Sequence, residues 1–390
     1  MKILHYLTTF DFGLGGITQY VYQALKAFSE RNIEATLAVS RNVDIPPSWL
    51  ENGTLPNVIE LDSSPGFYGR LNKNAVEQIV NLAESHDVVH LHGAWCLGNV
   101  AIARRLKAKK IPYVISTHGM LDDWSMKQNG FLKKVYNITL NKGLFGGASS
   151  IHCTAEFEKE QVINNLKCPE SQIYLTPYVV ATDLPETNAD VARDKFSIDE
   201  NSFNVLFLSR LHHKKRPDLL LKSAAMHNNS NESQPIRLFM AGPGDEDYVS
   251  ELKMLAAELG IQDSVVWTGM VREPLKTSLF LACDVFSLPT MQENFGIVFV
   301  EALLSGLPII TTKGTDIYRE LEEAGAMIVP HEEEAISTEL SKLKNDPELR
   351  KRLSDKGKQF VQKWLNHDKV IADHLSMYAI AERAFLGQQK

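Results

Sequence analysis

The sequence predicts an α/β protein made of two doubly wound domains, each a parallel sheet with helices on both faces. Three observations support this fold class. The 390 residues exceed the size of one ordinary core. Short apolar runs alternate with helical segments, which is typical of parallel sheets. The alternation stops at a polar segment, residues 181–194, and then begins again, so we place the domain boundary there.

The first domain, residues 1–181, opens with a buried strand at Ile3–Leu7, and Gly15 and Gly16 then begin a helix that continues to Phe28. The elements that follow alternate in type. Strands are expected at 35–39, 57–61, 88–92, 113–117 and 149–154, and helices at 75–83, 100–107 and 156–165.

The second domain, residues 195–367, repeats this pattern. Strands are expected at 204–208, 237–241, 264–267, 284–288 and 307–310, and helices at 217–226, 249–259, 275–282, 294–305 and 346–364. Asn366 and His367 break the chain before a last long helix within residues 368–390.

Composition excludes several classes of protein. The 41 basic and 48 acidic residues give a net charge of −7, so the chain does not bind nucleic acid through bulk charge. The four cysteines are scattered, as in a reduced cytoplasmic protein. No apolar run approaches the roughly 20 residues that span a bilayer.

The most informative motif pairs Glu293 with Glu301, with seven residues between them, where a predicted strand leads into a predicted helix. Glu293 follows the carboxyl end of the strand, where open α/β sheets bind ligands. The helix start offers amides and a positive dipole end to an anion. Two carboxylates beside an anion site suit a ligand with many hydroxyls and a phosphate. The expected amides are those of Asn294, Phe295, Gly296 and Ile297.

This arrangement resembles the Glu-x7-Glu signature of retaining glycosyltransferases of family 4, and further motifs match in order along nearly the whole chain. The resemblance implies the GT-B fold, in which two Rossmann-like domains face each other across a cleft. It implies acceptor binding by residues 1–181 and nucleotide-sugar binding by residues 195–367. It also implies that helix 368–390 packs back on the first domain.

Two motifs of the first domain match the family. The loop with Gly15 and Gly16 corresponds to one that approaches the donor diphosphate, with a simple tight turn as the alternative. Thr18 stands where a dinucleotide fingerprint needs a third glycine. His118 matches the active-site histidine, which would hydrogen-bond the donor sugar; a core histidine is the alternative.

His90, His92 and His152 accompany His118 at predicted strand ends. A His-x-His pair can bind metal. No acid joins these histidines at ligand spacing, and the family resemblance implies metal-independent transfer, so no metal site is predicted. His90 and His92 either line the acceptor side or serve the core.

In the second domain, Arg210 and Lys215 match the basic pair that grips the diphosphate, since phosphoryl oxygens suit a forked donor and a point charge. A solvated basic loop is the alternative. By resemblance, Glu293 would hold sugar hydroxyls and Glu301 the ribose. Gly242 and Met270 match positions near the nucleotide base, although a purely structural role fits them equally.

The basic segment 127–142 has apolar residues interleaved, including Phe131, Val135 and Ile138. Such a segment can rest on an anionic membrane, or form a solvated helix with a buried apolar face. The expected location is therefore cytoplasmic, with a peripheral contact at the inner face of the plasma membrane as a further option.

The resemblance implies a metal-independent, retaining hexosyltransferase without a cofactor. Its donor would be a UDP-hexose, with UDP-glucose as the first choice, and its acceptor a glycan or lipid-linked glycan in polysaccharide biosynthesis. Three alternatives stay open: a UDP-sugar 2-epimerase, a nicotinamide-dependent dehydrogenase, which Thr18 disfavours, and an inactive binding protein. Donor, acceptor, linkage and oligomeric state are not legible in the sequence.

Overall fold

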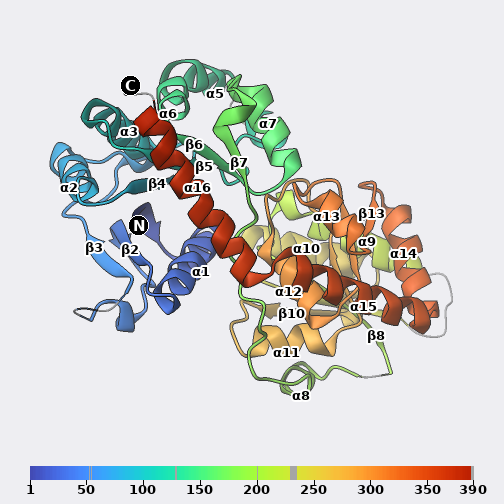
Figure 1. Ribbon diagram of the computed structural model, residues 1–390. Helices are drawn as coiled ribbons and strands as arrows, with labels where there is room; N and C mark the ends of the chain where they lie inside the picture. The colour runs from blue at the N-terminus through green and yellow to red at the C-terminus, as the bar shows by residue number, and fades with distance from the viewer. Residues whose placement is uncertain (52, 54, 128–129, 200, 229–234, 388–390) are drawn as a thin grey trace. The chain divides into compact units, whose positions relative to one another are not determined.

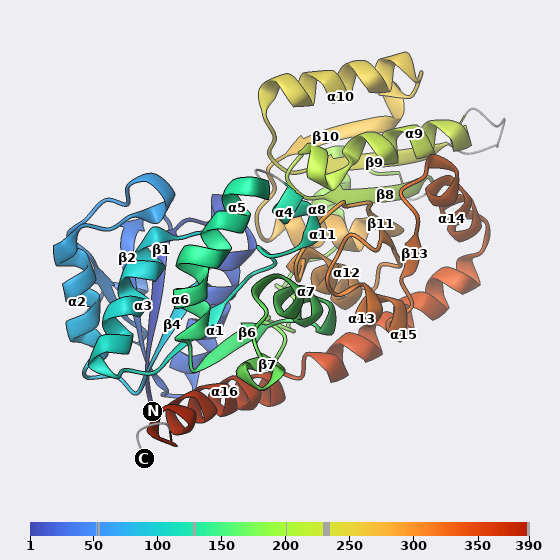
Figure 2. The ribbon, with the colours of Figure 1, turned by 90° about the horizontal axis from the view of Figure 1, so that it is seen from above.

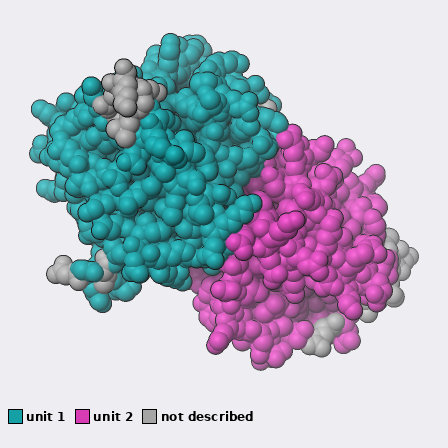
Figure 3. Space-filling model, in the orientation of Figure 1, with its two compact units in different colours: residues 1–181, 367–390 teal, residues 182–366 magenta. Residues whose placement is uncertain are grey.

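The computed structural model describes residues 1–390 except 52, 54, 128–129, 200, 229–234 and 388–390, and except the side chains of 123 and 385–387. The chain divides into two compact units (Figure 3). Unit 1 contains residues 1–181 and 367–390, and unit 2 contains residues 182–366. Each unit has one parallel sheet covered by helices, so the predicted α/β class with two Rossmann-like domains is confirmed.

The sheet of unit 1 has seven described strands in the order β3-β2-β1-β4-β5-β6-β7 (Figure 1). Its central strands are buried along their whole length, as expected when helices cover both faces. The strands are β1 Lys2–Phe10, β2 Glu34–Asn42, β3 Asn57–Glu60, β4 Val88–His92, β5 Tyr113–Ser116, β6 Ser150–Cys153 and β7 Ile173–Leu175.

The helices of unit 1 connect these strands. The longer ones are α1 Gly16–Glu30, α2 Lys73–Ala83, α3 Leu97–Lys109 and α7 Glu156–Leu166. Between β5 and β6 the chain forms α4 Asp123–Lys127, α5 Gly130–Tyr136, the π-helical turn η4 Asn137–Asn141 and α6 Lys142–Gly146. Short 3-10 turns are η1 Phe12–Leu14, η2 Pro47–Trp49, η3 Phe67–Gly69 and η5 Glu170–Gln172.

Unit 2 repeats the plan with six described strands in the order β10-β9-β8-β11-β12-β13. The strands are β8 Phe203–Leu208, β9 Ile236–Ala241, β10 Val265–Gly269, β11 Val285–Leu288, β12 Ile309–Thr312 and β13 Met327–Val329. The helices are α8 Asp190–Phe196, α9 Pro217–Asn228, α10 Glu246–Glu258, α11 Leu275–Ala282, α12 Ile297–Ser305, α13 Tyr318–Glu323, α14 Glu333–Asn345 and α15 Pro347–Trp364, with 3-10 turns η6 His213–Lys215 and η7 Gln262–Ser264.

The last helix, α16 His367–Gly387, belongs to unit 1 although it ends the chain. It packs on α1 and across β4, β5 and β6 (Figures 1 and 2). Its buried residues recur every three or four positions and so form one apolar stripe: Val370, Ile371, His374, Met377, Tyr378 and Ala381. No described helix is both long and apolar enough to cross a bilayer.

Nearly all predicted site residues lie just beyond the carboxyl end of a strand, where parallel sheets bind ligands. In unit 1, Gly15 and Gly16 follow β1 and His118 follows β5. In unit 2 the loop after β8 carries Arg210, and the loop after β11 carries Glu293. Gly242 and Met270 follow β9 and β10 in the same way.

Candidate functional site

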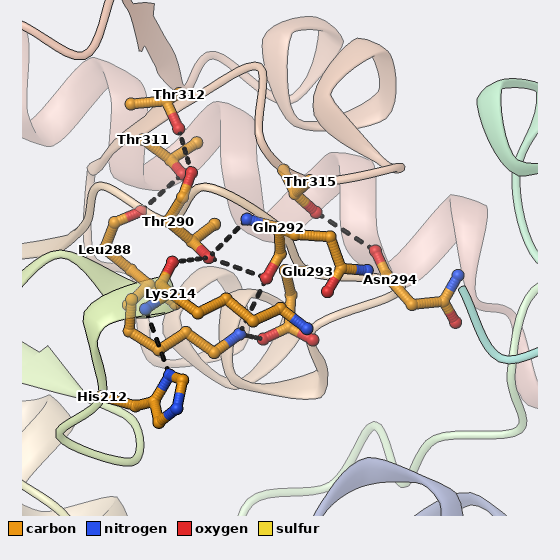
Figure 4. Close-up of polar contacts among 11 residues, drawn as sticks. His212, Lys214, Leu288, Thr290, Gln292, Glu293, Asn294, Thr311, Thr312 and Thr315 are labelled. Carbon is orange, nitrogen blue, oxygen red and sulfur yellow. Dashed lines mark hydrogen bonds and ion pairs between the residues drawn. The ribbon is translucent and has the colours of Figure 1, made fainter. Parts of the chain in front are cut away.

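The loop that carries Glu293 is held from several sides. The backbone amide of Glu293 donates to the carbonyl of Gly314 at 2.7 Å, and the carbonyl of Glu293 accepts from the amide of Asp316 at 2.9 Å. The hydroxyls of Thr311 and Thr312 donate to the carbonyls of Leu288 and Thr290, at 2.8 and 2.6 Å (Figure 4). The loop therefore presents its acid from a fixed backbone.

Glu293 forms an ion pair with Lys215, whose ammonium bonds Oε2 of the acid and also donates to the carbonyl of Gln292 at 3.2 Å. Lys215 is 5% exposed. Burial opposes ionisation of Glu293, but the charges of Lys215 and Lys214 hold its pKa below the ordinary value. The site thus contains an ionised carboxylate beside a buried ammonium, with the exposed Arg210 at the end of the neighbouring strand β8.

The helix after this loop starts later than predicted. The sequence places the helix start at Asn294, whereas α12 begins at Ile297. Gly296 has φ of 59°, a left-handed conformation that breaks the helical path, and a Cβ there would lie 2.8 Å from Cγ of Glu293 and 2.6 Å from the ring of Phe299. No side chain caps this helix start, so its dipole favours an anion there.

The residues before Gly296 have structural partners. The amide of Asn294 bonds the carboxylate of Glu293, and its side chain donates to Asp316 at 3.0 Å. Phe295 is buried, with its ring 5.4 Å from that of Trp364. The Phe295 side chain therefore belongs to the core.

Glu301 lies within α12 and pairs with Lys276, whose ammonium is 2.6 Å from Glu301 and 3.0 Å from Glu273. Burial raises the pKa of Glu301 above its ordinary value, against the attraction of Lys276. Sequence reasoning missed Lys276. It lies 25 residues before Glu301 and matches no motif, so only the fold brings the two together.

Gly242 is required by the packing of two loops. It has φ of 134°, its amide donates to the carbonyl of Gly269 at 2.8 Å, and a Cβ there would lie 1.9 Å from the carbonyl oxygen of Ser209. It also lines a pocket of about 470 Å³ at the ends of β9 and β10. Met270, in the loop after β10, is 50% exposed.

In unit 1, the loop that carries Gly15 and Gly16 borders open space. Gly15 has φ of 102° and precedes α1 with no side-chain hydrogen bond from the N-cap residue. Beyond the neighbouring backbone, no atom of the described residues lies within 4 Å of a Cβ built on Gly15 or Gly16. Residues at the carboxyl ends of β1 and β4 and in nearby loops line a pocket of about 430 Å³. Its lining includes Thr8, Leu14, Thr18, His92, Trp95, Met120, Ser125 and Lys133.

His118 occupies the turn after β5 with φ of 53°, and 8% of it is exposed. Its Nε2 lies 3.0 Å from Nδ1 of His92, and its Nδ1 lies 2.5 Å from the hydroxyl of Tyr178. Burial lowers the pKa of His118 to about 3. Both ring nitrogens therefore have protein partners, whereas the sequence predicts a hydrogen bond to the donor sugar.

Glu158 holds this turn and was not singled out from the sequence. One oxygen accepts from the hydroxyl of Thr117 at 2.6 Å and the amide of Gly119 at 2.7 Å. The other accepts from the amide and hydroxyl of Thr154 at 2.7 and 2.8 Å. An acid in the first turn of α7 that reaches back to the preceding strand end is a readable capping signal.

The other histidines gather more closely than predicted. His90 is fully buried and so belongs to the core, while His92 also lines the 430 Å³ pocket. His5, absent from the prediction, joins them, and ligand atoms of His5, His90 and His92 all lie within 4.8 Å of one another. Three imidazoles at this spacing match a metal-ligand set.

The basic segment 127–142 also lines an apolar groove of about 450 Å³. The groove shares Tyr68, Trp95 and Lys133 with the 430 Å³ pocket, so the two are adjacent. Its other lining is mostly apolar: Phe67, Leu97, Leu132, Val135, Tyr136, Thr139 and Leu140. Phe131 and Ile138 lie on the same segment with 79% and 73% exposure.

Comparison with known proteins accounts for both units. The family described as Glycosyl transferases group 1 matches residues 188–360, and Glycosyltransferase Family 4 matches residues 14–184. The chain belongs to the family 4, group 1 glycosyltransferases. This glycosyltransferase is 25% identical, over 373 residues, to a D-inositol 3-phosphate glycosyltransferase of Thermomonospora curvata. The match covers 87% of this chain and 85% of the relative.

A shorter match, 28% identical over 233 residues, is the alpha-monoglucosyldiacylglycerol synthase of Streptococcus pneumoniae, covering 57% of this glycosyltransferase and 51% of that enzyme. Among solved structures, Anabaena HepE in complex with UDP and glucose superimposes with a TM-score of 0.78 at 19% identity, covering 96% of this chain and 99% of that one. Sucrose-phosphate synthase from Thermosynechococcus elongatus gives 0.76 at 17% identity, covering 97% and 98%. These structural matches establish the GT-B fold.

Proposed function

We propose that this glycosyltransferase moves a hexosyl group from a nucleotide-diphosphate sugar to a glycan or lipid-linked glycan acceptor, with retention of anomeric configuration and without a metal ion. The observation that carries the proposal is the pair of Glu293 and Lys215 at the carboxyl end of a strand, beside the uncapped start of α12. A carboxylate can accept sugar hydroxyls while an ammonium and helix amides meet a phosphate.

In unit 2, charge on the leaving diphosphate increases as the glycosidic bond breaks, and groups that meet this charge lower the barrier. Arg210, Lys215 and the backbone at 295–297 would do so, with Asn294 fixing the loop. Glu293 would hold sugar hydroxyls and Glu301 the ribose. The backbone at Gly242 and Met270 would border the base. Because these cations and amides neutralise the diphosphate, we expect transfer to survive chelation.

In unit 1, Gly15 and Gly16 would approach the diphosphate, and His118 would serve the reacting region. Retention would follow from attack by the acceptor on the face that the diphosphate leaves, with a diphosphate oxygen taking the acceptor proton. The carboxylate of Glu158 contacts the His118 turn. It is 1% exposed and already accepts four hydrogen bonds, which argues against a role as a displacing nucleophile.

The acceptor would bind the 430 Å³ pocket with its sugar and the adjacent apolar groove with a lipid chain. The groove supports a lipid-linked glycan over a free one, because its aliphatic and aromatic lining offers little to hydroxyls. Exposed Phe131 and Ile138 on the same basic segment support contact with an anionic bilayer on the cytoplasmic side. The Streptococcus relative, by its name, makes a glycolipid.

For the donor we propose a UDP-hexose, by analogy with Anabaena HepE, which has been solved with UDP-glucose. Thermal unfolding with UDP-, GDP- and ADP-sugars tests this choice, since a ligand at about 100 times its Kd adds about 2.7 kcal/mol. We expect UDP-glucose to stabilise the protein. Glu293→Ala should abolish this shift, and Glu323→Ala, an exposed acid on α13, should keep it.

Product analysis completes the experiment. An NMR coupling constant should show an α-linked product from an α-linked donor, in EDTA as well as in its absence. A β-linkage would exclude retention, and activity restored by manganese after loss in EDTA would exclude metal independence. Conversion of the donor sugar without any acceptor would instead indicate the 2-epimerase.

A further inference from the structure

Unit 1 contains a continuous chain of buried hydrogen bonds that includes five histidines. It begins at the carbonyl of Thr176 and ends at the hydroxyl of Tyr178, next to His118. The first four links lead to the Tyr378 hydroxyl: Thr176 O to His152 Nε2 (2.8 Å), His152 Nδ1 to Ser116 Oγ (2.7 Å), Ser116 Oγ to His90 Nε2 (2.7 Å) and His90 Nδ1 to the Tyr378 hydroxyl (2.8 Å). The next four lead from that hydroxyl to His118 and Tyr178: Tyr378 hydroxyl to His5 Nε2 (3.4 Å), His5 Nδ1 to His92 Nε2 (3.1 Å), His92 Nδ1 to His118 Nε2 (3.0 Å) and His118 Nδ1 to the Tyr178 hydroxyl (2.5 Å).

All five histidines are at most 8% exposed. Burial lowers the pKa of His5 and His118 to about 3 and that of His152 to about 4. It lowers the pKa of His90 and His92 well below the ordinary value, aided by the neighbouring histidines. The rings are therefore neutral at physiological pH. A neutral imidazole has one nitrogen that donates and one that accepts.

The carbonyl end sets the direction of every bond in the chain. A carbonyl only accepts, so Nε2 of His152 carries the proton and Nδ1 accepts the hydroxyl proton of Ser116. Ser116 has one proton, so its oxygen accepts from Nε2 of His90, and Nδ1 of His90 then accepts from Tyr378.

The same reasoning continues beyond Tyr378. Its oxygen accepts from Nε2 of His5, whose Nδ1 accepts from Nε2 of His92. Nδ1 of His92 then accepts from Nε2 of His118, whose Nδ1 accepts from Tyr178. Every histidine of the chain is thus protonated on Nε2, and no link joins two donors or two acceptors.

We propose that this chain fixes His118 as the Nε2–H tautomer and that Tyr378, on the last helix, is a positioning residue for His118. The inference rests on the proposed function only where it places His118 in the reacting region. With both nitrogens committed, the His118 ring is held at one angle and neither gives nor takes a proton. Tyr378 matters because it joins the strand histidines into one chain.

A metal bound by His5, His90 and His92 would conflict with this chain. All six ring nitrogens of these residues already take part in its links. An ion would therefore displace hydrogen bonds on both sides of Tyr378. We accordingly assign the cluster to hydrogen bonding, and metal content becomes an outcome of the test.

Histidine ¹⁵N NMR of the whole protein measures the tautomers directly, because protonated and unprotonated ring nitrogens resonate far apart. His118→Gln assigns the His118 signals. We expect Nε2–H for His118 in the wild type. In Tyr378→Phe the link to the carbonyl end is broken, so His118 should become a mixture of both tautomers, and kcat should fall about tenfold with an unchanged KM for the donor.

Two further variants make the test specific. Ser116→Ala breaks the chain elsewhere and should produce the same mixture at His118. Tyr20→Phe is the matched control, since it also removes a buried tyrosine hydroxyl next to α16. That hydroxyl bonds His374, whose Nδ1 donates to the carbonyl of Val370, so it lies outside the chain. His118 should keep its tautomer in this control.

Wild-type His118 protonated on Nδ1 would overturn the proposal. So would a His118 tautomer that survives both Tyr378→Phe and Ser116→Ala, or one equivalent of tightly bound metal that shifts the His5, His90 and His92 signals. The tautomer is read without substrate. A protein that transfers no sugar but shows these spectra would therefore refute the proposed function and leave the chain intact.

Discussion

Glu158 shows how a carboxylate can shape a site by holding backbone. Its two oxygens each accept two hydrogen bonds, and these bonds join the Thr117–Gly119 turn to Thr154. The turn contains His118 at a positive φ, a conformation that costs energy in a residue other than glycine. Glu158 supplies contacts that offset this cost.

We therefore expect Glu158→Gln to destabilise the protein strongly. An amide nitrogen accepts no hydrogen bond, so whichever oxygen it replaces, it would face a buried backbone amide, of Gly119 or of Thr154, and leave that donor unsatisfied. The free energy of unfolding should fall by about 3 kcal/mol, measured by urea unfolding. Glu156→Gln is the control, because Glu156 is half exposed and pairs only at the surface with Lys159. Equal unfolding midpoints for the two variants would contradict this account.

Single site residues could be predicted from the sequence where a motif fixes their identity and position. The sequence located Glu293, Lys215 and Gly296, and the structure places them together in one loop system. It could not reveal partners that distant segments supply, such as Lys276 for Glu301 or Tyr178 for His118. Nor could the sequence show that both ring nitrogens of His118 have hydrogen-bond partners, because one partner, His92, lies on the adjacent strand β4.

At the scale of elements, the segment between β5 and β6 is the most distinctive. Its apolar residues were expected either to face a membrane or to be buried, and the structure leaves Phe131, Leu132 and Ile138 at 66–79% exposure. Helical periodicity alone does not distinguish a stripe that packs on the protein from one that faces outward. The exposed stripe and the adjoining groove agree with a lipid-linked acceptor.

We expect the double variant Leu132→Ser, Val135→Ser to weaken use of a lipid-linked acceptor. Both side chains line the groove and are 66% and 45% exposed, so the fold should tolerate the change. KM for the lipid-linked acceptor should rise on the order of tenfold or more, while KM for the donor stays constant. Met254→Ser, which removes an exposed apolar side chain from unit 2, should change neither constant. An unaltered acceptor KM in the double variant would exclude the groove as the lipid site.

Element prediction succeeded for long, strongly patterned segments and failed for short ones. The sequence predicted the apolar strands of both sheets and the helices that end at a glycine. No prediction covered the short elements β7, β13, α8 and α13, which have three to seven residues each. The 13-residue α14 was also missed, because it has a mixed, charged surface. α12 began three residues late because a left-handed glycine interrupts the expected helix.

For the whole molecule, the buried histidines predict acid sensitivity. A histidine has an ordinary pKa of 6.5, and burial lowers it to about 3 for His5, His118 and His374. Below pH 6.5 the unfolded chain binds protons that the folded chain refuses. The free energy of unfolding therefore falls as pH decreases from 6.5 toward 4, by up to about 1.4 kcal/mol per pH unit for each histidine.

Urea unfolding at pH 7, 6 and 5 measures this slope, and the midpoint should drop steadily. His374→Phe should reduce this dependence of the unfolding free energy on pH by about one proton. A midpoint that does not vary over this interval would show that the histidines are not held neutral.

Unit 1 is completed by residues 367–390, which are synthesised after the whole of unit 2, residues 182–366. At about 5–20 residues per second, roughly 10 to 40 s separate the emergence of residue 181 from that of residue 390. During that interval β4, β5 and β6 lack the contacts of α16, and the strand histidines lack Tyr378. Unit 1 is thus begun on the ribosome before unit 2 and finished after it.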